Sequence, residues 1–238
     1  MVSKSQIKLI TRLKQKKYRQ QERLFIAEGI KTIQELLNST LELHHVFTTR
    51  SFNFNAKSET IINETELKKI SFLSTPNRAL AIFEIPESKD IQVNKLIIAL
   101  DDVRDPGNLG TIIRLCDWFG IQDLVCSEST VDCYNPKVIQ ATMGSITRVN
   151  ISYVKLESFL KNNKMDVYGA FMDGDNVYKT NLPKQGVLVL GNEANGISPA
   201  IEACLGNKIT IPRFGDLQIT ESLNVATATA ILLSEFKR

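Results

Sequence analysis

Polar residues that can bind or activate a ligand occur in three segments, each placed where an apolar strand is expected to end and a helix to begin. Asn108 and Arg114 lie in the first segment, Glu193 in the second, and Ser222 and Asn224 in the third. Amides, hydroxyls and carboxylates can hold a hydroxyl group, and a guanidinium can bind a phosphate or a carboxylate. Ligands of open α/β sheets bind beyond the carboxyl ends of the strands, so the three segments predict one composite site.

The first segment, residues 105–110, is a turn that leads into a helix predicted over 108–119. Asn108 suits the N-cap of that helix. The turn is neither the Gly-x-Gly-x-x-Gly of dinucleotide folds nor a phosphate-binding loop ending in Gly-Lys-Ser/Thr, which disfavours a Rossmann-type dehydrogenase. Arg114 follows among apolar residues, where an unpaired charge is costly. It therefore forms either a structural ion pair, with Asp117 or Glu193, or part of a binding site.

The second segment contains two glycines, Gly191 and Gly196, that leave the backbone free to approach a ligand closely. Glu193 between them could accept a hydrogen bond, pair with an arginine or cap a helix. In the third segment Ser222 is the predicted N-cap of a helix over 222–236. Asn224 is then free to face the site.

The elements that would position these residues form a regular alternation of strands and helices from Lys95 onward. Runs such as LIIAL and VLVL lack the alternation of a half-exposed strand, which indicates strands buried on both faces. We therefore expect an α/β fold with a mostly parallel sheet and helices on both faces. Residues 1–90 read as a separate small α/β domain, joined by the polar stretch 87–94 to a second domain over 95–238.

The positive charge is concentrated in the first domain. Residues 1–94 contain 15 Lys/Arg and 10 Asp/Glu, whereas residues 95–238 contain 14 and 16. Much of the excess lies in a predicted helix over residues 4–20, with Lys14, Lys16, Lys17 and Arg19 as candidate contacts to a nucleic-acid backbone. Such a stripe can meet a phosphate backbone, although a solvated helix face has the same composition.

Several classes of protein are disfavoured by what the sequence lacks. No apolar run approaches the roughly 20 residues of a membrane span, and the N-terminus does not have the pattern of a signal peptide. The four cysteines have no Cys-x-x-Cys spacing, and the two histidines, His44 and His45, are adjacent. We therefore expect no metal site, no membrane partner, reduced thiols and a cytoplasmic location.

The three segments together resemble the three motifs of the SpoU/TrmH family of RNA 2′-O-ribose methyltransferases, of the SPOUT class. The resemblance covers residues 95–238. It is carried by Asn108 and Arg114; by Gly191, Asn192, Glu193 and Gly196; and by Ser222, Leu223, Asn224 and Val225. The stretch FIAEGIKTIQELL resembles part of the substrate-binding domain that often precedes this family's catalytic domain.

The resemblance implies a fold, a cofactor and a set of residue roles. The C-terminal part would form a trefoil knot, and the protein would be a homodimer. S-adenosyl-L-methionine would bind to Leu190, Gly191, Asn192, Gly196, Ile211 and Leu223. The catalytic residues would be Asn108, Arg114, Glu193, Ser222 and Asn224, with Arg114 as an orienting clamp or as an aid to deprotonation.

The substrate implied by the resemblance is structured RNA, with ribosomal RNA preferred. Only RNA carries the 2′-hydroxyl that this chemistry needs. Two alternatives stay open, a tRNA 2′-O-methyltransferase and a non-catalytic RNA-binding or ribosome-assembly protein on the same fold.

Overall fold

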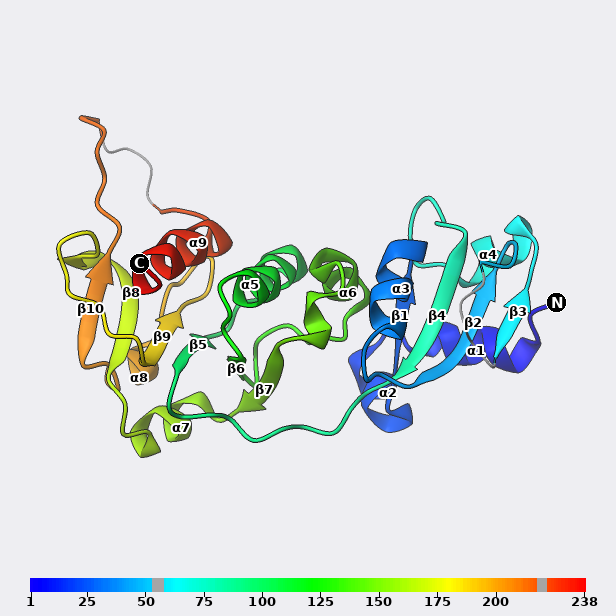
Figure 1. Ribbon diagram of the computed structural model, residues 1–238, viewed down its shortest axis with the longest axis horizontal. Helices are drawn as coiled ribbons and strands as arrows, with labels where there is room; N and C mark the ends of the chain where they lie inside the picture. The colour runs from blue at the N-terminus through cyan, green and yellow to red at the C-terminus, as the bar shows by residue number, and fades with distance from the viewer. Residues whose placement is uncertain (53–57, 218–221) are drawn as a thin grey trace. The chain divides into compact units, whose positions relative to one another are not determined.

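The computed structural model describes residues 1–52, 58–217 and 222–238, and these form two compact units (Figure 1). The N-terminal unit comprises Met1–Glu87 together with Asp132–Thr147, and the C-terminal unit comprises Ser88–Val131 and Arg148–Arg238. The sequence-based division placed residues 132–147 with the second domain, whereas their contacts place them with the first. No helix among the described residues is long and apolar enough to cross a membrane.

The N-terminal unit is built on a four-stranded sheet of order β1-β4-β2-β3. Strand β4 is antiparallel to β1 and β2, and β3 is parallel to β2. The elements are α1 (Lys4–Arg12), α2 (Lys16–Glu22), β1 (Leu24–Glu28), α3 (Ile30–Leu37), β2 (Leu43–Thr48), β3 (Glu59–Ile61), α4 (Glu64–Ile70), β4 (Ala79–Glu84), α6 (Pro136–Thr142) and the 3-10 helix η1 (Ser145–Thr147). Strand β1 is buried along its whole length, and helix α6, from the distant segment, packs against it.

The single helix predicted over residues 4–20 is interrupted, because α1 ends at Arg12 and α2 begins at Lys16. The guanidinium of Arg19 donates to the carbonyl oxygens of Leu13 and Lys14, at 2.8 and 2.9 Å. A side chain thus satisfies carbonyls that a continuous helix would satisfy through its own backbone.

The prediction that Arg19 contacts RNA is wrong. Its side chain is 2% exposed, and its Nε and Nη2 atoms lie 2.8 and 2.5 Å from Oδ2 of Asp132. A buried guanidinium needs such a partner, because an unpaired charge in the interior is costly. Arg19 therefore joins α2 to the segment 132–147 within the N-terminal unit.

The C-terminal unit has a six-stranded sheet of order β10-β8-β9-β5-β6-β7, in which every described pairing is parallel. Strands β5 and β9 at its centre are buried throughout, as their apolar sequences predict. Helices α5 and α9 lie on one side of the sheet, and α7 and α8 lie on the other (Figure 1). The predicted mostly parallel α/β fold is confirmed. The elements are β5 (Leu96–Leu100), α5 (Pro106–Trp118), β6 (Asp123–Ser127), β7 (Asn150–Val154), α7 (Leu156–Asn162), β8 (Val167–Asn176), β9 (Gly186–Leu190), α8 (Pro199–Glu202), β10 (Asn207–Thr210) and α9 (Val225–Phe236).

Both site helices begin with a cap other than the predicted one. Helix α5 has Pro106 in its first turn, and Oδ1 of Asp105 accepts from the backbone N–H of Asn108. Helix α9 starts at Val225, with Asn224 rather than Ser222 as its N-cap. Proline is favoured at the first helical position because it has no N–H to leave unsatisfied. Because Asp105 caps α5, the side chain of Asn108 is not used for capping and can take part in the site.

Candidate active site

A cavity of about 1200 Å³ lies in the C-terminal unit beyond the ends of β9 and β10. Its walls come mainly from the segments 190–197, 209–217 and 222–228, which include the second and third sequence motifs. All six residues predicted to hold a cofactor line it: Leu190, Gly191, Asn192, Gly196, Ile211 and Leu223. The predicted catalytic residues Glu193, Ser222 and Asn224 line it as well. The second and third segments therefore meet at this cavity, although Gln218–Glu221 of the third segment fall outside the described residues.

The loop after β9 is closed on itself by backbone hydrogen bonds. Asn192 and Gly196 exchange both N–H···O bonds at 2.9 Å, and the side-chain oxygen of Asn192 accepts from the N–H groups of Ala194 and Asn195. Gly196 has a φ of +67°, a conformation that favours glycine. A Cβ atom on Gly191 would overlap the backbone of Gly196 and Ile197, so this wall of the cavity requires glycine at position 191.

Replacing Gly191 with alanine is expected to weaken binding of the cofactor that the resemblance implies, S-adenosyl-L-methionine, by about 10-fold or more, because the loop must move to admit a methyl group against backbone atoms. Isothermal titration with S-adenosylmethionine measures the change. Gly215→Ala is the matched control, since Gly215 also lines the cavity but a Cβ there meets no atom of the described residues within 4 Å. Equal affinities for the Gly191 variant and the unaltered protein would show that the loop tolerates the side chain.

A chain of hydrogen bonds joins all three motifs. Nδ2 of Asn108 donates to Oε1 of Glu193 at 2.9 Å, and Nδ2 of Asn224 donates to Oδ1 of Asn108 at 2.8 Å. Oδ1 of Asn224 in turn accepts from the first N–H groups of α9. Each amide is thus fixed in orientation by its neighbours, and Asn108 is held between the other two motifs.

The carboxylate of Glu193 is the anchor of this chain. Its oxygens also accept from the backbone N–H groups of Arg104 and Asp105, each at 3.2 Å. Burial by itself raises the pKa of Glu193, but the hydrogen bonds from Asn108 and the backbone outweigh it, so the pKa lies below its ordinary value. Glu193 is therefore ionised at neutral pH and acts as an acceptor that orients Asn108.

Arg114 is exposed and makes no hydrogen bond or ion pair with any other described residue. The ion pair considered from the sequence does not form, because Asp117 binds Arg148 and Glu193 binds Asn108. Ile112, Ile113 and Cys116 are buried in the core, whereas Arg114 lies on the outer face of α5. Its guanidinium is free to meet a bound ligand.

Sequence reasoning missed the pair formed by Asp102 and Arg104 just before the first motif. Nε of Arg104 donates to Oδ1 of Asp102 at 2.9 Å, and the backbone oxygen of Asp102 accepts from Nδ2 of Asn192 at 2.7 Å. Hydrogen bonding and the charge of Asp102 raise the pKa of Arg104 above its ordinary value. The only signal in the sequence was the charge alternation of Asp-Asp-Val-Arg-Asp, which is common in solvated loops.

No group of three or more histidine, cysteine, aspartate or glutamate side chains that could hold a metal ion occurs in the described ranges. Cys116 is fully buried, and burial raises the pKa of its thiol. The candidate site is made of amides, carboxylates, arginines, apolar side chains and glycine-rich backbone.

Comparison with known proteins gives matches along nearly the whole chain. The SpoU rRNA Methylase family matches residues 95–234, and the MRM3-like substrate binding domain matches residues 4–81. A curated relative, the 23S rRNA (guanosine(2553)-2′-O)-methyltransferase RlmP of Bacillus subtilis, is 29% identical over 232 residues, which cover 93% of this chain and 92% of that protein.

Two solved structures are similar over the full length of the chain. One, described as an RNA methyltransferase of the TrmH family from Porphyromonas gingivalis, has a TM-score of 0.89 and 37% identity and covers 99% of this chain and 98% of its own. The other, an rRNA methyltransferase from Sinorhizobium meliloti with AdoMet bound, has a TM-score of 0.88 and 30% identity and covers 100% and 96%. The second and third motifs line one cavity and the first is hydrogen-bonded to both. The chain belongs to the SpoU rRNA Methylase family.

Proposed function

We propose that this protein transfers a methyl group from S-adenosyl-L-methionine to a ribose 2′-hydroxyl of ribosomal RNA. The observation that carries the proposal is the chain Glu193–Asn108–Asn224 beside a glycine-walled cavity. Two relatives support the substrate class, since one is named as a 23S rRNA 2′-O-methyltransferase and the other is an rRNA methyltransferase solved with AdoMet.

The cavity suits this cofactor in size and in chemistry. Apolar side chains such as Leu190, Ile211 and Leu223 offer a slot for the adenine ring. The tight approach of the backbone at Gly191 and Gly196 leaves main-chain groups, rather than charges, to recognise its polar edge. When bound, the cofactor supplies an activated methyl group on a sulfonium centre.

The protein's own residues would orient the acceptor. The fixed amides of Asn108 and Asn224 can hold the 2′-hydroxyl in line with the methyl group, which lowers the entropic part of the barrier. Because a guanidinium stays protonated in proteins and is a poor base, we assign Arg114 as a clamp on the neighbouring phosphate that also favours loss of the proton electrostatically. Ser222, exposed at the cavity wall, is a further hydrogen-bonding partner for the ribose.

The N-terminal domain, residues 1–90, would bind the RNA, and residues 95–238 would carry the catalytic chemistry. Lys14, Lys16 and Lys17 are exposed, in contrast to Arg19, and the Lys14 ammonium lies 5.9 Å from the centre of the Phe72 ring. Exposed lysines beside a ring suit a phosphate backbone with an unstacked base.

Changing Lys14, Lys16 and Lys17 together to alanine is expected to weaken RNA binding and to lower the salt slope by about 0.7 for each phosphate that is no longer bound, because each bound phosphate releases a counterion. Filter binding over a series of salt concentrations measures this slope. Lys161→Ala, on α7 and paired with Glu157, is the control for removal of a surface charge. An unchanged slope in the triple variant would mean that these lysines form a solvated helix face.

Three further features complete the proposal. The C-terminal segment would thread through a loop to give the trefoil knot, which brings the second and third motifs to one cavity. The protein would be a homodimer, an idea supported by Trp118, which is 83% exposed on the same face of α5 as Arg114. The protein would act in the cytoplasm, a location consistent with a ribosomal RNA substrate.

Transfer of labelled methyl to separate pools of unmodified ribosomal RNA and tRNA tests the substrate class. Label in ribosomal RNA supports the proposal, and label in tRNA alone would replace it with a tRNA methyltransferase. Absence of both label and cofactor binding would favour a non-catalytic RNA-binding protein.

A further inference from the structure

Arg104 lies beside the Glu193 network but takes no part in it through its side chain. Its backbone N–H donates to Oε2 of Glu193 at 3.2 Å, so the residue is placed directly at the rim of the candidate site. Its guanidinium points instead to Asp102, with Nε 2.9 Å from Oδ1 and Nη2 2.9 Å from Oδ2. The two groups form a two-point ion pair, although the Arg104 side chain is 71% exposed.

Asp102 is itself held firmly. Its backbone N–H donates to Oγ of Ser127 at 2.9 Å, and its carbonyl accepts from Asn192 at 2.7 Å. Its φ of +58° is uncommon for a residue with a side chain, and such conformations persist where the surroundings fix them. The carboxylate of Asp102 therefore holds the guanidinium of Arg104 in a fixed position.

This ion pair is poorly explained as a device for stability. Exposed pairs contribute little to folding, because water screens the charges. A guanidinium has five N–H donors, and Asp102 is the only described residue that binds this one. A fixed arginine with spare donors facing solvent is well suited to a second anion, and phosphate matches its planar fork.

The charges around the site make such an arginine useful. Asp102, Asp105 and Glu193 place three carboxyl groups near the first motif, and each would repel an approaching phosphate. Arg114, six residues after Asn108, supplies one free cation on this helix. Arg104 supplies another at the opposite end of the motif and neutralises Asp102 at the same time.

We propose that Arg104, held by Asp102, binds an RNA phosphate adjacent to the target ribose and thereby positions the 2′-hydroxyl. The inference rests on the proposed function. Arg104 acts on RNA binding and on alignment, whereas the methyl donor lies against other residues. Cofactor affinity should therefore not depend on Arg104.

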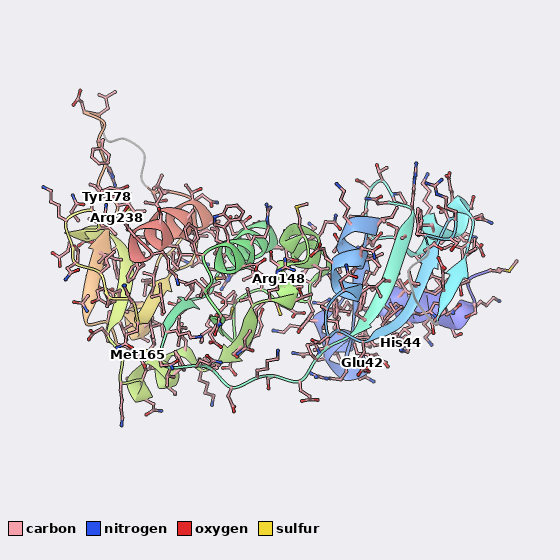
Figure 2. The ribbon with its side chains drawn as sticks, viewed as in Figure 1. Glu42, His44, Arg148, Met165, Tyr178 and Arg238 are labelled. Carbon is pink, nitrogen blue, oxygen red and sulfur yellow. The ribbon has the colours of Figure 1, made fainter. Side chains whose placement is uncertain are left out.

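The test compares Arg104→Met and Arg104→Lys with a matched control, Arg148→Met. Arg148, labelled in Figure 2, is also a partly exposed arginine, 47% exposed, that binds an aspartate, Asp117. Asp117 lies nine residues beyond Asn108 on α5, about 13 Å along the helix. The readouts are KM and kcat for in vitro transcribed 23S rRNA, the salt slope of binding to that RNA without cofactor, cofactor affinity and Tm.

Arg104→Met is expected to raise KM for the RNA by about 10- to 100-fold, the range for removal of a charge-assisted hydrogen bond, and to lower the salt slope by about 0.7. Arg104→Lys should retain part of the affinity for RNA, since lysine keeps the positive charge but lacks the two-pronged guanidinium geometry. Arg148→Met should change neither the KM for the RNA nor the salt slope. Tm and cofactor affinity should be the same in all four proteins.

Unchanged KM and slope in Arg104→Met would overturn the proposal, as would an equal effect in Arg148→Met or an effect that follows a fall in Tm. Failure of the proposed function looks different. In that case the unaltered protein transfers no methyl to RNA, yet the salt slope of binding still reports whether Arg104 contacts a phosphate.

Discussion

Arg114→Ala lowers methyl transfer by at least about 10²- to 10³-fold, the usual cost of removing one preorganised group that stabilises developing charge. The expectation follows from the position of Arg114, which is exposed on α5 and has no partner among the residues that the structure describes. Because it does not line the cavity, cofactor affinity should stay nearly unchanged. Single-turnover methyl transfer and isothermal titration measure the two quantities.

Thr111→Ala is the control for Arg114→Ala, since Thr111 lies one turn earlier on the same exposed face of α5. It should retain most of the activity. Collapse of cofactor binding in the Arg114 variant would assign this arginine to the cofactor site instead. Arg114→Lys is less informative, because charge and fork geometry change together.

Arg19→Met is expected to destabilise the protein by about 3–5 kcal/mol, because it leaves Asp132 as an unpaired, largely buried charge. Asp132 is 13% exposed, and the carbonyls of Leu13 and Lys14 would be left without their donor at the same time. Urea unfolding followed by circular dichroism measures the change. The same variant should also show whether the α1–α2 break depends on this side chain.

Two further variants test whether the loss of stability comes from the Arg19–Asp132 ion pair. Lys17→Met, exposed on the same helix, should stay within about 0.5 kcal/mol of the unaltered protein. Adding Asp132→Asn to Arg19→Met should recover part of the stability, since it removes the orphaned charge. A destabilisation no larger than that of Lys17→Met would mean that Arg19 and Asp132 contribute little to the fold.

The central sheet and the site loops could be predicted because their signals are local. The apolar runs over 96–100 and 186–190 indicate strands buried on both faces, and both strands are. Polar and glycine residues after such strands must gather at one edge of a parallel sheet. The residues around Asn108, Gly191 and Asn224 therefore met as expected.

The features that were missed depend on contacts between distant residues. The break between α1 and α2 depends on Arg19, whose partner Asp132 is 113 residues away. Its charge in the sequence looked like that of its exposed neighbours Lys16 and Lys17. Likewise, the apolar sequence around Arg114 suggested burial, but helical spacing places Arg114 on the exposed face of α5, together with Thr111 and Trp118.

The predictions of the two helix N-caps were wrong for a different reason. Asn108 and Ser222 are both good N-cap residues, and in each case a neighbour with equal capping ability was used instead. Asp105 precedes a proline that fixes the first turn of α5, and Asn224 directly precedes Val225. N-cap propensity alone therefore does not predict which of two such neighbours caps the helix. The choice depends on the tertiary hydrogen bonds between Asn108, Glu193 and Asn224.

The most direct test of the central claim is the chemical identity of the methylated position in RNA. Ribosomal RNA treated with the protein and labelled S-adenosylmethionine is hydrolysed in alkali and then analysed by mass spectrometry. A methyl group on the 2′-oxygen blocks cleavage at that ribose, so we expect label in one alkali-resistant dinucleotide, absent with Arg114→Ala. Label in alkali-sensitive mononucleotides, as base methylation would give, would contradict it.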